Sequence, residues 1–216
     1  MERLFFYFKE IESFGYNVET IVFLITLILT LINIYSLNKQ WNKIIKSGIK
    51  SVSFLFFSYL CSAAFSAVVY SFFKASLSLL LNGFCVGVMA LLITREMLLS
   101  GKISLRDKVI GLCLSPLTIL AVGFIPARHE LFFVFGLVLV AALGHQIYEV
   151  IKNRSMGSMH YGPAVFGVFS SSFWLIYSFL FDLWPLKINN SLFLASWITL
   201  LFCFYKFPNK EVVRPK

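Results

Sequence analysis

Two neighbouring asparagines, Asn189 and Asn190, open one of the most apolar stretches of the chain, which continues as SLFLASWITLLFCFY. A third asparagine, Asn82, begins another apolar stretch in the first half. Hydrocarbon offers an amide no water, so an asparagine in a membrane pairs with another helix, with trapped water or with a bound solute. The three amides are therefore candidates to bind a small polar solute; holding neighbouring helices together is the alternative.

Aromatic and hydroxyl side chains could complete such a site. Trp174 and Tyr177 lie three residues apart, a spacing that places two side chains on one face of a helix. An aromatic plane suits the C–H face of a sugar or another flat ring, but plain packing is an equally good explanation in a chain with 25 phenylalanines. Ser53 and Ser62 are the serines that we expect to add a hydroxyl group.

The elements that must position these residues are membrane-spanning helices. Hydrophobic residues make up 59% of the 216 and charged residues 13%, a balance typical of an integral membrane protein. A transmembrane helix needs about 20 mainly apolar residues. Seven stretches meet this requirement: 20–37, 51–73, 75–94, 109–127, 131–148, 161–181 and 188–205. We therefore expect an all-α integral membrane fold with short links and no soluble domain.

The basic residues indicate the orientation. Outside these stretches and at their ends, 14 lysines and arginines fall on one side of the membrane and 5 on the other. Because basic residues accumulate on the cytoplasmic side, we expect the amino terminus outside, the carboxyl terminus in the cytoplasm, and the plasma membrane as the location. The same rule accounts for the net charge of +9 without a nucleic-acid partner. The run LFFYF at 4–8 is expected to be an aromatic anchor at the membrane surface.

An internal repeat divides the chain into two halves. KSVSF at 50–54 and YSFF at 70–73 have counterparts in GSMHY at 157–161 and YSFL at 177–180, both at the same displacement along the chain. We expect a three-helix repeat at 20–97, a linker with the fourth helix at 98–128, a second repeat at 129–206 and a cytoplasmic tail at 207–216. The single linker helix lets both repeats enter the membrane in the same direction, and parallel repeats of this kind hold a transporter's substrate site at their interface.

The repeated motifs resemble those of a known family. KQWNKIIKSGIKSVSF and HQIYEVIKNRSMGSMHYG resemble the PQ-loop motif of the SWEET and PQ-loop transporters, and FWLIYSFLFDLWPLKINN resembles the later part of the SWEET repeat. The resemblance implies a SWEET-like arrangement of 3 + 1 + 3 helices. It also implies facilitative transport, by alternating access, of a small neutral polar solute such as a sugar.

The resemblance implies roles for single residues as well. Asn82 and Asn190 would face the central path and hydrogen-bond the solute, and Trp174 would form a stacking wall beside it. The internal repeat, by contrast, pairs Asn82 with Asn189, because these two are separated by the same displacement as the repeated motifs. We rank Asn190 first because isoleucine precedes the asparagine pair as it does in the family run.

Two glutamines occupy the PQ-like positions, Gln40 and Gln146, and we expect them to contribute to gating. The prolines that precede them in the family are replaced by Lys39 and His145. Because proline is a common source of kinks and hinges, the gating movement is expected to differ. His145 could couple transport to protons; a plain interfacial hydrogen bond is the alternative. Every aspartate and glutamate lies outside the expected helices or at their ends, which favours facilitated diffusion.

Other functions fit the residues less well. A proton-linked amino-acid or vitamin carrier on the same scaffold is the first alternative. A receptor similar to the KDEL receptor would need arginines inside the membrane, and the expected helix interiors contain none. An enzyme is not expected, because no catalytic triad, carboxylate pair or metal-ligand spacing is arranged within the helices. The expected partners are a small-molecule substrate and the lipid bilayer, without cofactor, metal or nucleic acid; association with further copies of the chain stays open.

Overall fold

The computed structural model describes residues 8–207, apart from the side chains of residues 114 and 115. Within this part of the chain no strand occurs, and seven helices are long and apolar enough to cross a membrane. The expected all-α membrane fold is thereby confirmed. Residues 4–7 of the expected aromatic anchor, and all but the first residue of the expected tail at 207–216, lie outside the described residues.

The helices follow one another with short links. A short helix, α2 (Lys9–Glu12), precedes the spanning helices, which are α3 (Val18–Ser47), α4 (Phe54–Lys74), α5 (Leu77–Leu99), α6 (Leu105–Phe124), α7 (Arg128–Asn153), α8 (Tyr161–Leu180) and α9 (Trp184–Lys206). Five of them begin after a residue whose side chain accepts a backbone N–H bond from the first turn: Asn17, Ser53, Ser76, Ser104 and His160.

Two helices differ from the expected ranges in a way that moves candidate residues. α3 runs to Ser47, well past the expected end at residue 37, so Gln40 lies inside the helix. The stretch NKQWNKIIK is polar but helix-forming, and hydropathy marks where lipid contact ends rather than where the helix ends. α9 begins at Trp184, with Pro185 in its first turn, so Asn189 and Asn190 lie within the helix and not at its start.

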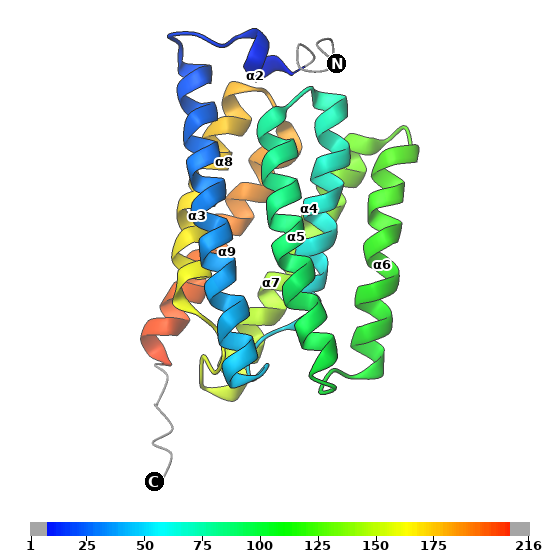
Figure 1. Ribbon diagram of the computed structural model, residues 1–216, viewed down its shortest axis with the longest axis vertical. Coiled ribbons are helices and arrows are strands. Elements are labelled where there is room, and N and C mark those ends of the chain that lie inside the picture. Colours follow the sequence, from blue (N-terminus) through cyan, green and yellow to red (C-terminus); the bar gives the residue numbers. More distant parts are fainter. Residues whose placement is uncertain (1–7, 208–216) are drawn as a thin grey trace.

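The two helix triplets pack in the same order. In the first triplet α5 contacts both α3 and α4, and in the second α9 contacts both α7 and α8. The triplets meet where α4 contacts α7 and where α3 contacts α8. The linker helix α6 packs on α4 and α7 at one side of the bundle, at the right of Figure 1. This arrangement fits two repeats around a common centre; the repeat boundaries at 20–97 and 129–206 stay a prediction.

Buried apolar side chains form two clusters, one at each end of the bundle. We call them upper and lower after Figure 1, in which α2 lies at the top and α9 ends near the bottom. The upper cluster consists of Val22, Tyr70, Leu79, Val122, Phe132, Trp174, Tyr177 and Leu183. The lower cluster includes Ile44, Phe57, Met97, Leu143, Val150 and Met156. Between the two clusters the helices enclose a cavity.

Candidate substrate site

A central cavity with two connected lobes lies between the triplets. The lobes have volumes of about 160 Å³ and 190 Å³. The upper lobe reaches residues of the upper cluster, such as Leu79 and Phe132, and the lower lobe reaches Leu37 and Met159. Helices of both triplets contribute the residues that line both lobes, which are Leu60, Asn82, Val86, Leu139, Trp174, Asn190 and Phe193. Both halves of the chain therefore build the two adjoining lobes.

Three amides meet at this cavity. Asn82 and Asn190 line both lobes, and Asn189 lines the upper lobe alone. The Oδ1 atom of Asn82 accepts a hydrogen bond of 3.1 Å from the hydroxyl group of Thr30 on α3. The Nδ2 atom of Asn190 donates to the carbonyl oxygen of Leu186 in its own helix, at 2.9 Å. In the described structure these bonds occupy one end of each amide, so that the N–H groups of Asn82 and the carbonyl oxygen of Asn190 can make further hydrogen bonds.

Asn189 and Asn190 differ in what surrounds them. The Nδ2 atom of Asn189 donates a long bond of 3.4 Å to the carbonyl oxygen of Phe133 on α7, and its Oδ1 atom is buried without a partner among the described residues. The helices approach closely here, because a Cβ atom on Gly136 would clash with that same Nδ2 atom. Asn189 is thus held between α7 and α9, whereas Asn190 borders the space that both lobes share.

Trp174 and Tyr177 lie in different surroundings. Trp174 is buried and lines both lobes. Tyr177 packs edge-on against Trp174, with ring centroids 5.0 Å apart, but is not among the residues that line the cavity. Its hydroxyl group instead contacts the Oε1 atom of Glu10 and the Oγ atom of Ser76, each at 2.8 Å. Tyr177 therefore packs against Trp174 and connects α8 to Glu10 and Ser76.

The two expected serines lie away from the cavity. Ser53 caps α4: its Oγ atom accepts from the backbone N–H of Phe56. Ser62 lines a separate pocket between α4, α6 and α7, which includes Thr118 and Phe135. Neither serine borders the two central lobes in the described structure.

Four further polar residues line the cavity although the sequence did not predict them there. Ser66 lines the upper lobe, with its Oγ atom buried and unpartnered among the described residues. Asn33, Ser170 and Ser171 line the lower lobe. A signal existed for Ser170, because it lies four residues before Trp174 and thus on the same helix face. Asn33 lies within the first apolar stretch, where it has no asparagine counterpart in the second repeat.

The two glutamines make equivalent contacts at the lower end. The Oε1 atom of Gln40 accepts from the backbone N–H of His160 at 2.7 Å, and its Nε2 atom donates to the carbonyl oxygen of Ser158 at 3.0 Å. The Oε1 atom of Gln146 accepts from the N–H of Ser53 at 2.6 Å, and its Nε2 atom donates to the carbonyl oxygen of Ser51 at 2.7 Å. Both side chains are fully buried. Each glutamine thus binds the loop of the other triplet.

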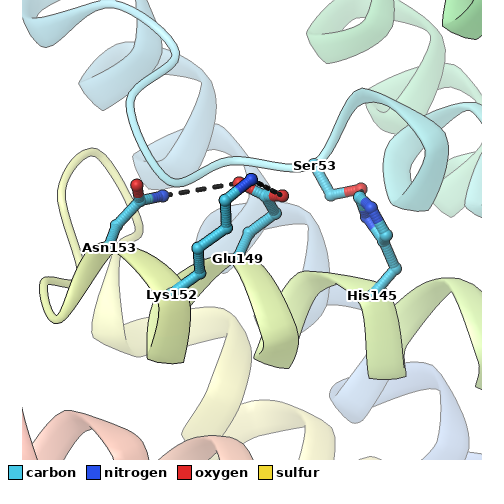
Figure 2. A network of polar contacts seen from close by, with 5 residues as sticks. All are labelled: Ser53, His145, Glu149, Lys152 and Asn153. Atoms are coloured by element: carbon cyan, nitrogen blue, oxygen red, sulfur yellow. Dashed lines mark hydrogen bonds and ion pairs between the residues drawn. The ribbon is translucent and has the colours of Figure 1, made fainter.

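His145 lies beside this contact but on the surface. Its side chain is exposed, and its Nδ1 atom lies 3.2 Å from the Oγ atom of Ser53 (Figure 2). Further along α7, Glu149 accepts from Asn153 and lies 3.9 Å from Lys152 in the same view. His145 borders neither central lobe. Its place fits an interfacial hydrogen bond; whether it couples transport to protons stays a prediction.

The second loop carries another histidine at the lower end. Burial, together with the positive charges of Lys43 and Lys39, lowers the pKa of His160 below its ordinary value. The neutral ring can accept through Nδ1, and that atom receives the backbone N–H of Gly162 at 2.9 Å. His160 therefore caps α8 in its neutral form.

The second triplet matches a known family. Residues 131–212 match the model of the family described as sugar efflux transporter for intercellular exchange. No curated protein and no solved structure matches the chain. The matched segment contains Trp174, Asn189 and Asn190. Residues 131–212 are thus similar to the SWEET sugar transporters, and the seven spanning helices of the described chain are consistent with a SWEET-like membrane transporter.

Proposed function

We propose that the protein is a facilitative transporter of a small neutral polyhydroxylated solute, a sugar or a close analogue, which it moves by alternating access. The observation that carries this proposal is the meeting of Asn82 and Asn190, one from each triplet, at the space shared by both cavity lobes. A site at the interface of two parallel repeats is where transporters of this architecture bind their substrates.

The polar groups at the cavity suit hydroxyl groups. A sugar hydroxyl both donates and accepts, and the free ends of Asn82 and Asn190 offer N–H donors and a carbonyl acceptor. Trp174 adds an aromatic face for the C–H surface of a pyranose ring. The residues that line the two lobes in the described structure include no charged side chain. A charged solute would therefore lose its hydration without an ionic partner, which favours a neutral one.

Alternating access requires contacts between the triplets that can break at either end. At the lower end Gln40 and Gln146 each bind the opposite loop. At the upper end the hydroxyl group of Tyr70 contacts the Nδ1 atom of His129 at 2.6 Å, which joins α4 to α7. Because an acid or histidine is absent from the lining of the described lobes, uniport rather than proton coupling is the consistent mechanism. We further propose the plasma membrane as its location, with the α2 end outside.

Uptake by proteoliposomes tests the proposal. Labelled glucose and sucrose are supplied to wild-type protein and to the double variant Asn82→Ala with Asn190→Ala, with and without a pH gradient. Asn42→Ala is the matched control, because this amide is exposed and bonds to Asn38 in its own helix. We expect uptake that needs no pH gradient, that Asn42→Ala preserves, and that the double variant lowers at least about tenfold through the loss of two buried hydrogen bonds.

The opposite results have distinct meanings. Unchanged uptake by a folded double variant would show that the amides do not bind the solute. Uptake that depends on the pH gradient would overturn uniport, and His145→Ala would then be the next variant. If folded wild-type protein carries neither sugar, the substrate class is wrong, and neutral amino acids and vitamins become the solutes to supply.

A further inference from the structure

We propose that Glu10 on the short helix α2 is a gating residue, whose bond to Tyr177 holds the upper end of the cavity closed. The inference rests on the proposed alternating access but not on the identity of the solute. It concerns a segment that precedes the spanning helices.

The carboxylate of Glu10 is buried between the two triplets, with 1% of the residue exposed. Its Oε2 atom accepts from the backbone N–H of Leu77 at 2.9 Å. Its Oε1 atom accepts from the N–H of Ser78 at 3.1 Å, from the hydroxyl group of Ser76 at 2.8 Å and from that of Tyr177 at 2.8 Å. The first three donors belong to the start of α5 in the first triplet, and Tyr177 belongs to α8 in the second.

The surroundings keep this carboxyl group ionised. Burial by itself raises the pKa of Glu10, but the backbone N–H groups of Leu77 and Ser78 and the hydroxyl group of Tyr177 outweigh burial and hold the pKa below its ordinary value. The start of a helix also favours negative charge, because its N–H groups are unpaired and its dipole is positive there. Lys9 and Lys74 border the same small pocket and add positive charge.

The contacts of α2 indicate which bond breaks when the upper end opens. α2 is tied to the first triplet by three of the four bonds of Glu10 and by the backbone bond from Lys9 N–H to the carbonyl oxygen of Ala75, at 2.8 Å. The bond to Tyr177 is the contact of this carboxylate that crosses to the second triplet. When α5 and α8 separate, α2 therefore stays on α5, and the bond between Glu10 and Tyr177 opens.

This bond lies directly above the cavity. Tyr177 packs on Trp174, and both belong to the upper cluster together with Leu79. Trp174 and Leu79 line the upper lobe, and α2 lies across this end of the bundle in Figure 1. A solute that enters from this end must pass between the helices that Glu10 joins.

The internal repeat supports the assignment. Tyr70 and Tyr177 occupy equivalent positions in the two YSF motifs, and each hydroxyl group contacts an ionisable side chain near the start of the opposite triplet. For Tyr70 that side chain is His129; for Tyr177 it is Glu10. Asp182, a second acid at this end, is exposed and instead pairs with Lys187 at 2.6 Å.

Accessibility of the cavity from each side of the membrane tests the proposal without any substrate. The four cysteines Cys61, Cys85, Cys113 and Cys203 are replaced, and Ala67→Cys, which lines the upper lobe, becomes the reporter. A membrane-impermeant maleimide is applied in turn to the two sides of oriented vesicles. Glu10→Gln and Tyr177→Phe are compared with the parent protein and with Glu12→Gln, an exposed acid on the same helix.

We expect Tyr177→Phe and Glu10→Gln to raise the labelling rate from the α2 side about tenfold and to lower it from the other side. Each variant removes or weakens a hydrogen bond that exists only when the upper end is closed, so it destabilises the closed state relative to the open one. Glu12→Gln should change neither rate. Tyr177→Phe leaves the three hydrogen bonds between Glu10 and the start of α5 intact. A changed labelling rate in this variant would therefore reflect gating and not a loss of folding. Unchanged rates, or rates that rise from both sides, would overturn the proposal. Absence of sugar uptake would leave this labelling result unaffected.

Discussion

Replacing Gln40 with methionine isolates the contribution of one cross-triplet contact at the lower end. Methionine has a similar length and volume and fills irregular gaps, so the change removes two hydrogen bonds with little change in packing. In the variant the backbone N–H of His160 and the carbonyl oxygen of Ser158 lose their partners in a buried region. The loops remain covered by the lower cluster, to which Met156 and Met159 belong, so water cannot easily replace the glutamine.

The magnitude follows from the two orphaned groups. Each buried polar group without a partner costs about 1–3 kcal/mol, and the greater apolar burial of methionine offsets part of this cost. A net loss of about 3 kcal/mol in the free energy of unfolding is therefore expected. For a chain of this length, that loss corresponds to a decrease in melting temperature of roughly 6–12 °C. Gln146→Met should cause a similar decrease, because Gln146 makes the equivalent bonds to Ser51 and Ser53.

Thermal unfolding of detergent-purified protein measures the effect. Asn42→Ala is the control, because the exposed amide of Asn42 bonds within α3, and its loss should change stability by less than about 0.5 kcal/mol. If Gln40→Met melts within about 2 °C of Asn42→Ala, the two bonds do not stabilise the contact between the triplets. A decrease for Gln40→Met without one for Gln146→Met would contradict the equivalence of the two glutamines.

Two further predictions concern stability at the upper end and at the cavity. Since the folded protein holds the pKa of Glu10 below its ordinary value of 4.5, the carboxylate stabilises the fold fully above that pH and loses its contribution as the pH falls below it. Melting temperatures between pH 7 and pH 3 should therefore fall less steeply for Glu10→Gln than for wild type, and an equal slope would exclude this group as a source of the acid sensitivity. Gly136→Ala should destabilise the protein by about 1–3 kcal/mol, because the added Cβ atom meets Asn189, whereas Gly144→Ala on the same helix has nothing within 4 Å and should be neutral or stabilising. Equal melting temperatures for the two variants would argue against the close approach of α7 and α9.

Much of the architecture could be predicted because it depends on local and averaged properties. Hydropathy located the spanning helices, since a helix of about 20 apolar residues is the length that a bilayer requires. Helix ends were less predictable: α3 continues to Ser47 because backbone hydrogen bonds, unlike lipid contact, extend into polar sequence. The internal repeat indicated amides in both halves, because the same displacement that relates the two YSF motifs also relates Asn82 to Asn189.

The choice between Asn189 and Asn190 shows where sequence alone was insufficient. Adjacent residues on a helix point about 100° apart, so a one-residue ambiguity decides whether a side chain lines both lobes or lies against α7 and lines the upper lobe alone. The internal repeat favoured Asn189 and the family resemblance favoured Asn190, and only the packing of α9 against α7 at Gly136 distinguishes their surroundings. The same limit applies to Ser53 and Ser62. Their hydroxyl groups suit a polar site, but Ser53 caps α4 and Ser62 lines a separate pocket.

The sequence by itself determined the class of the protein, its spanning segments and the pair of amide-bearing helices, because hydrophobicity and internal repetition act through nearby residues. Only the tertiary structure decided which polar groups meet. Glu10 and Tyr177 are separated by 167 residues, and Gln40 bonds to a loop 118 residues away. The spacing of residues along the chain does not specify the partners in such contacts, since these depend on how complete helices pack.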